Sequence, residues 1–167
     1  PARPAPMTPG VQKPRRLKPA PFPVAEVPEK HEPDCHAPQL PRKALVHGHC
    51  EQKSIMKFDR DKQLLKKICL DIEVPDSGCC GMAGAFGFEK DHYDVSIACG
   101  ERVLLPAVRK STKDTLIVAD GFSCREQIRQ TTDRKALHLA QVMKMALDQG
   151  PHGPTGDYPE ANYITAT

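Results

Sequence analysis

Short apolar runs alternate with amphipathic stretches between residues 42 and 148, and the alternation predicts strands that alternate with helices. The runs KALVH (43–47), LDIEV (70–74) and LIVA (116–119) have the length and composition of strands. In the second run Leu70, Ile72 and Val74 alternate with charged residues, which is typical of a half-buried strand. The third run is apolar throughout, which predicts a strand that is buried on both faces.

Helical spacing of apolar residues connects these strands. Residues 52–68 favour two short helices, and residues 86–109 favour one long helix that Pro106 ends or kinks. Further helices are expected after Gly121 and over 137–147. This order predicts a small α/β domain of two or three layers, with a short, mostly parallel sheet.

Proline content divides the chain. Twelve of its 17 prolines precede Arg42, so residues 1–41 are expected to be a disordered, proline-rich linker. Residues 42–148 hold the strands, the helices and most of the cysteines, and we expect them to form a cysteine-rich domain. Residues 149–167 are rich in Gly and Pro and are expected to form a flexible tail.

Charge and hydropathy exclude several classes of protein. The net charge of +3 is spread among acidic residues, and aromatic residues are few, so a nucleic-acid partner is not expected. No stretch has the apolar length of a membrane span, and the first forty residues contain no apolar core of a secretory signal. The expected location is therefore the cytoplasm, where cysteines serve as metal ligands or reactive thiols more often than as disulfides.

Four of the seven cysteines follow predicted strands. Cys50 comes after the first strand, the pair Cys79 and Cys80 after the second, and Cys124 after the third. Loops at the carboxyl ends of parallel strands gather at one edge of a sheet, so we expect these four thiols to meet there. Thiolates are soft ligands that select iron–sulfur clusters, zinc or monovalent copper. Adjacent cysteines suit a multi-iron cluster better than one tetrahedral ion, because neighbouring side chains diverge.

The other thiols and the nearby histidines do not share this pattern. Cys69 and Cys99 lack flanking glycines and are expected to be core residues, whereas Cys35 lies in the linker and has no assigned role. His47 and His49 flank the first cysteine loop. They could donate hydrogen bonds to cluster sulfur, bind zinc or contact a substrate, and the alternative is that they are ordinary polar loop residues.

Several stretches together resemble a known family. The segments HGHCEQKS, DSGCCGMAGAFGFEKDHYDVSIACGERVLLPAVR, IVADGFSCREQI and ALHLAQVMKMAL are similar to the C-terminal cysteine-rich (CCG) domain of FAD-linked oxidases. Related domains occur in the iron–sulfur subunit of glycolate oxidase and in heterodisulfide reductase. The resemblance covers residues 42–148. Two positions depart from it: Gly121 replaces the first cysteine of a final C-x-x-C, and Glu51 replaces a frequent histidine.

The resemblance implies a function in electron transfer. It implies a [4Fe–4S]-type cluster bound by Cys50, Cys79, Cys80 and Cys124, and a flavin-binding dehydrogenase domain or subunit, carrying FAD, as the partner. No flavin domain is present in this sequence, so we expect a part of an FAD-linked oxidoreductase that is not catalytically complete alone. The alternatives are a zinc-stabilised protein-binding module and a thiol–disulfide redox domain.

Overall fold

A three-stranded parallel sheet lies at the centre of the computed structural model, which describes residues 38–56, 58–68 and 70–165. Its strands are β1 (Lys43–His47), β2 (Asp71–Glu73) and β3 (Leu116–Ala119), in the order β2-β1-β3. Both neighbours run parallel to β1, and His47 pairs with Ala119 where β1 and β3 end. The predicted small α/β fold with a parallel sheet is confirmed.

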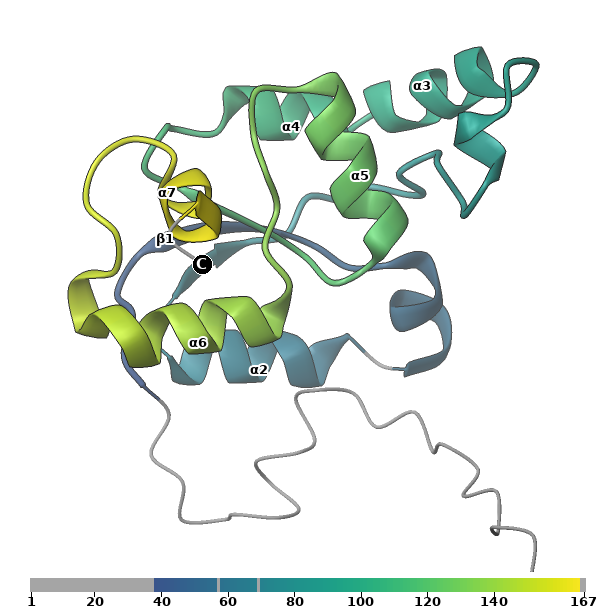
Figure 1. Cartoon of the computed structure of the whole chain (residues 1–167). Helices are drawn as coiled ribbons and strands as arrows, with labels where there is room; N and C mark the ends of the chain where they lie inside the picture. The colour runs from purple at the N-terminus through teal and green to yellow at the C-terminus, as the bar shows by residue number, and fades with distance from the viewer. Residues whose placement is uncertain (1–37, 57, 69, 166–167) are drawn as a thin grey trace, which may run out of the picture.

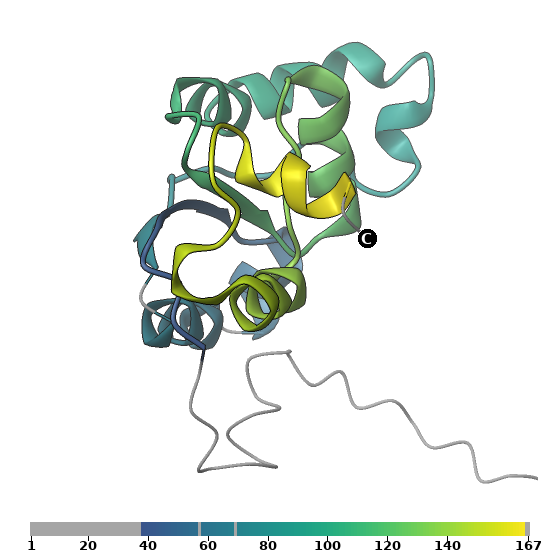
Figure 2. The same cartoon turned by 60° about the vertical axis from the view of Figure 1, so that its left-hand side comes forward.

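Helices cover both faces of the sheet (Figures 1 and 2). Helices α2 (Asp59–Lys67) and α6 (Leu139–Gln149) lie on one face, and α4 (Leu104–Lys110) and α5 (Phe122–Thr131) lie on the other. Successive side chains of a strand point to opposite faces. Accordingly Ala44 and Val46 join the core cluster under α2 and α6, whereas Leu45 joins the cluster under α4 and α5. The domain therefore has three layers.

The expected long helix over 86–109 is wrong. The structure instead contains a short 3₁₀ turn, η2 (Phe86–Phe88), then α3 (Tyr93–Glu101), and then α4. In a continuous helix the ring of Pro106 would clash with the carbonyl of Arg102. The chain avoids this clash by breaking at Val103, so that Pro106 falls in the first turn of α4, where backbone N–H groups have no intrahelical acceptor. The two short helices expected over 52–68 are present as η1 (Gln52–Met56) and α2.

Residues 150–165 differ from the flexible tail that the sequence suggested. They form a 3₁₀ turn, η3 (Gly150–His152), and a final helix, α7 (Pro159–Thr165), which packs on the domain. The Arg134 Nε atom donates to Glu160 Oε1 over 2.6 Å, and both side chains are buried. Tyr163 is also buried, within the core cluster under α6. Glycine and proline spacing signals a loop, but it carries no information about a distant ion-pair partner.

Some sequence-based expectations lie outside the described residues. These are the linker up to residue 37, Cys35 and Cys69. The division of the chain at residues 41/42 and 148/149 stays a prediction. Among the residues that the structure does describe, no helix has the length and apolar character needed to cross a bilayer.

Candidate functional site: a rim of four thiols

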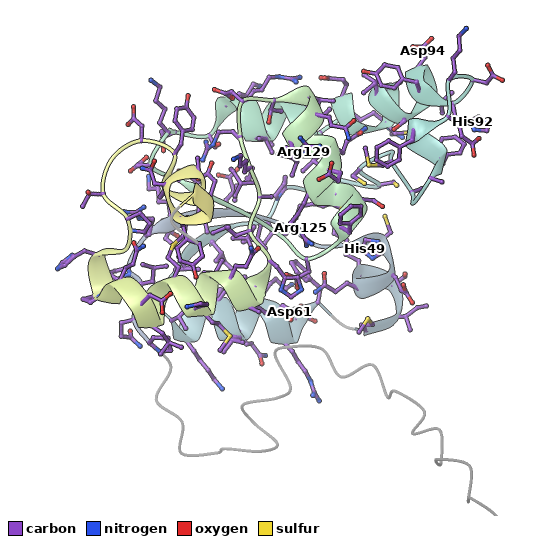
Figure 3. The ribbon with its side chains drawn as sticks, viewed as in Figure 1. His49, Asp61, His92, Asp94, Arg125 and Arg129 are labelled. Carbon is purple, nitrogen blue, oxygen red and sulfur yellow. The ribbon has the colours of Figure 1, made fainter. Side chains whose placement is uncertain are left out.

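The ends of the three strands bring the four predicted thiols to one edge of the sheet. Cys50 lies at the helical turn that leads into η1, Cys79 and Cys80 lie in the loop after β2, and Cys124 lies in the first turn of α5. Figure 3 shows sulfur atoms close to the labelled His49 side chain, beside the beginning of α5. We call Cys50, Cys79, Cys80 and Cys124 the thiol rim.

The four side chains of the thiol rim form a connected series. Cys50 interacts with Cys79, Cys79 with Cys80, and Cys80 with Cys124, and each interaction shifts the pKa of a thiol. The first two thiols are exposed and the last two are buried, and all four are free. The series therefore runs from the surface into the domain. The structure brings together the residues that the sequence selected, whereas their role as ligands stays a prediction.

Backbone N–H groups of the loop after β2 point at these sulfurs. Gly81 N–H donates to Cys79 Sγ over 3.3 Å, and the N–H groups of Met82 and Ala83 donate to Cys80. The loop achieves this with positive φ angles of 94° at Gly81 and 43° at Ala83. Consecutive N–H groups in such a conformation form a concave anion-binding nest. The loop thus favours negative charge on its sulfurs.

Glycine is required at two points around the thiol rim because other chain segments approach closely. A Cβ atom at Gly81 would lie 2.0 Å from the Ser96 carbonyl oxygen. A Cβ atom at Gly121 would lie 2.6 Å from His49 Cδ2 and 3.0 Å from Cys124 Sγ. Gly121 stands where related domains carry the first cysteine of a final C-x-x-C, and any side chain there would require His49 to shift.

The thiols differ in acidity. A hydrogen bond from the Cys124 thiol, aided by the N–H groups of the nest, lowers the pKa of Cys80 to about 6. The same hydrogen bond raises the pKa of Cys124, which keeps its proton. Burial raises the pKa of Cys79 to about 11. In the absence of metal, negative charge at neutral pH therefore concentrates on Cys80.

These pKa values predict the titration of the metal-free full-length chain. Ultraviolet absorbance of thiolates should show one group ionising near pH 6, because Cys80 is then the most acidic of the three perturbed thiols. Replacing Cys124 with alanine removes the stabilising donor, so this ionisation should move to higher pH. The matched variant Cys99→Ala, which leaves the donor in place, should keep it near pH 6. An unchanged titration in Cys124→Ala would contradict the assigned hydrogen bond.

A buried polar network fixes the first cysteine loop against the end of β3. The Gln52 side-chain amide donates to Asp61 Oδ2 over 2.5 Å and to Asp120 Oδ2 over 3.1 Å. Its carbonyl oxygen accepts from His49 N–H, next to Cys50. Asp120 also accepts from Leu139 N–H over 2.8 Å, at the beginning of α6. The network therefore connects the Cys50 loop with the loop that carries Cys124.

Two basic side chains bind carbonyl groups beside the thiol rim. Lys53 Nζ donates to the Ser77 carbonyl over 2.5 Å, and Arg125 Nη1 donates to the Asp120 carbonyl over 2.5 Å. Both cations are thereby held close to the cysteine loops. Their charge complements that of a thiolate-bound anionic group.

A small cavity opens beside Cys79. It has a volume of about 180 Å³ and is lined by Asp76, Gly78, Cys79, Cys99, Arg102 and Val103. Cys99 was expected to be a core thiol, but its side chain is only half-buried and faces this cavity. No signal in the sequence indicates this placement, because it depends on the break between α3 and α4.

Within residues 38–56, 58–68 and 70–165, no group of three or more His, Cys, Asp or Glu side chains is arranged to hold a metal ion. A tetrahedral zinc site needs all of its sulfurs about 2.3 Å from one point. The binding of a metal ion or cluster at the thiol rim therefore stays a prediction.

Comparison with known proteins gives partial matches to dehydrogenases. The chain is 34% identical over 109 residues to one subunit of the anaerobic glycerol-3-phosphate dehydrogenase of Escherichia coli K12, a match that covers 65% of this chain and 27% of the relative. It is 29% identical over 109 residues to the D-2-hydroxyglutarate dehydrogenase of Pseudomonas putida KT2440, covering 64% of this chain and 10% of that protein. The chain is similar to parts of dehydrogenases.

The chain spans about a quarter of the first relative and about a tenth of the second. No family model matches it, and no solved structure gives a significant match. The comparisons therefore confirm the coarser part of the resemblance, a similarity to portions of larger dehydrogenases. Membership of the cysteine-rich oxidase family stays a prediction.

Proposed function

We propose that this chain is the iron–sulfur electron-transfer module of a flavin-dependent hydroxyacid dehydrogenase. The thiol rim would hold one [4Fe–4S]-type cluster, which when bound supplies one-electron transfer. The observation that carries the proposal is the meeting of four free thiols from three loops at one sheet edge. The partial matches to dehydrogenases support it, since such a module needs the remainder of an enzyme to supply electrons.

The protein groups around the rim have distinct tasks in this proposal. The nest formed by Gly81, Met82 and Ala83 stabilises negative charge on the sulfurs of Cys79 and Cys80. The Gln52 network holds the Cys50 loop at a fixed separation from the Cys124 loop. Two thiols are exposed, so the bound group would reach the surface, where an electron-donating domain that carries FAD can approach. The cytoplasm is the proposed compartment, because it keeps free thiols reduced.

Anaerobic reconstitution tests the proposed function directly. The full-length chain should bind about four iron atoms when it is incubated with ferrous iron, sulfide and a reductant, and it should turn brown. Chemical reduction should bleach the sulfur-to-iron absorbance and yield a paramagnetic signal. A colourless chain without iron would contradict the proposal.

The same preparation distinguishes the two alternatives. One zinc ion per chain, bound in preference to iron, would indicate the zinc-stabilised binding module. A chain that binds neither metal but forms a reversible disulfide between rim thiols would indicate the thiol–disulfide redox domain. The disulfide alternative uses the nest less fully, because a nest of N–H groups favours an anionic group over a neutral disulfide.

A further inference from the structure

His47 is a buried histidine at the end of β1 with one unpaired ring nitrogen. Its side chain is 2% exposed, and Nδ1 lies 2.8 Å from the Ser77 hydroxyl, which is also buried. The other nitrogen, Nε2, is buried and has no hydrogen-bond partner among the described residues. Buried polar groups almost always have a hydrogen-bond partner, so a hydrogen-bonding ligand is expected at this position.

The direction of the strand places His47 on the sheet face that also carries two thiols of the rim. Side chains alternate along β1, so His47 shares the sheet face of Leu45, whose core cluster contains Cys80 and Cys124. Its register partner Ala119 belongs to the same cluster and stands five residues before Cys124. Ser77, which holds Nδ1, stands two residues before Cys79. The imidazole is thus anchored to the loop that carries Cys79 and Cys80, on the sheet face of Cys80 and Cys124.

The groups around His47 also determine which hydrogen bonds its ring can make. Lys53 Nζ binds the carbonyl of Ser77, so a cation is held close to the ring. Neutral imidazole carries one N–H, and when the Ser77 hydroxyl donates to Nδ1 that proton resides on Nε2. An N–H donor suits sulfide and thiolate sulfur, which are hydrogen-bond acceptors. Hydrogen bonds to cluster sulfur raise the reduction potential, since they stabilise the more negative, reduced form.

We propose that His47 Nε2–H donates a hydrogen bond to a sulfur atom of the group bound at the thiol rim. His47 is then a positioning residue that tunes this group and does not bind iron itself. The inference rests on the proposed function, because it requires an iron–sulfur group at the rim. The sequence left several roles open for His47, and this inference selects hydrogen bonding to sulfur.

The test compares reduction potentials of reconstituted full-length proteins by anaerobic redox titration. His47→Leu removes the donor, so it should keep its iron and show a more negative potential than the unmodified chain. His47→Gln retains an N–H donor and should lie between the two. His92→Leu is the matched control, because His92 is on the surface, where its ring stacks on Phe86 and is hydrogen-bonded to Glu89. The reduction potential of this variant should equal that of the unmodified chain.

Each outcome bears on one proposal. If the unmodified chain binds no iron, the proposed function fails before any variant is compared. If the chain binds iron and His47→Leu has an unchanged potential, only the role of His47 is overturned. Loss of iron from both His47 variants, with unfolding temperatures unchanged, would make His47 a ligand and would also overturn the inference.

Discussion

Replacing Cys80 with serine is expected to reduce the iron content of the reconstituted chain at least about tenfold, the scale on which even supporting residues of metal sites act. Cys80 is the central member of the thiol rim, because it contacts both Cys79 and Cys124 and receives N–H groups of the nest. Serine has nearly the same shape but offers a hard hydroxyl oxygen, which iron–sulfur clusters accept poorly. The measurement is iron per chain after anaerobic reconstitution.

The matched control is Cys99→Ser. This variant makes the same chemical change in a half-buried thiol that lines the cavity beside Cys79 but lies outside the thiol rim. It should retain the iron content of the unmodified chain. Equal loss of iron in both variants would mean that the ligand set is assigned wrongly. Retention of iron in Cys80→Ser would remove Cys80 from the set.

Much of the site could be predicted because its signals are local. Each cysteine loop follows a short apolar run, and the carboxyl ends of parallel strands always share one edge of a sheet. Three runs of strand-like residues therefore placed Cys50, Cys79, Cys80 and Cys124 together. The positive φ angles at Gly81, Ala83 and Gly84 are visible only in the structure.

The supporting network could not be predicted, because each of its members looks like an ordinary surface residue in the sequence. Gln52 and Asp61 lie in helix-forming stretches rich in charge, yet both are buried and hydrogen-bonded to each other. Their burial depends on how η1 and α2 pack against the end of β3. Polar residues are mostly exposed, so a sequence argument places them at the surface by default. The same reasoning places Arg134 and Glu160 at the surface, although both are buried.

The predicted single helix over residues 86–109 was wrong for a different reason. The apolar spacing across 86–109 is helical on both sides of the break, so periodicity alone joins the two helices. We expected the helix to end or kink at Pro106 itself. The proline ring would instead clash with the carbonyl group four residues earlier, so the helix already breaks at Val103. The break lies at the cavity beside Cys79, which Cys99, Arg102 and Val103 help to line.

Replacing Glu160 with alanine is expected to lower the free energy of unfolding by about 3–5 kcal/mol, because it leaves the buried Arg134 guanidinium without its carboxylate. Arg134 also donates to the carbonyls of Thr112 and Thr115 and to the Ser111 hydroxyl. The ion pair thus joins α7 to the segment that precedes β3. Denaturant unfolding of the full-length chain, followed by circular dichroism, measures the effect.

The control is Glu126→Ala, which breaks the more exposed pair between Glu126 and Arg129 on α5. Solvent screens that pair, so its loss should cost at most about 1 kcal/mol. The double variant Arg134→Met with Glu160→Leu removes both buried charges and should recover part of the stability, although the carbonyls of Thr112 and Thr115 then lose their donor. A cost in Glu160→Ala no larger than that in Glu126→Ala would mean that α7 is not docked in solution. In that case residues 150–165 would behave as the tail that glycine and proline spacing suggests. A large cost would instead make α7 part of the folding unit that holds β3, and through β3 the Cys124 loop.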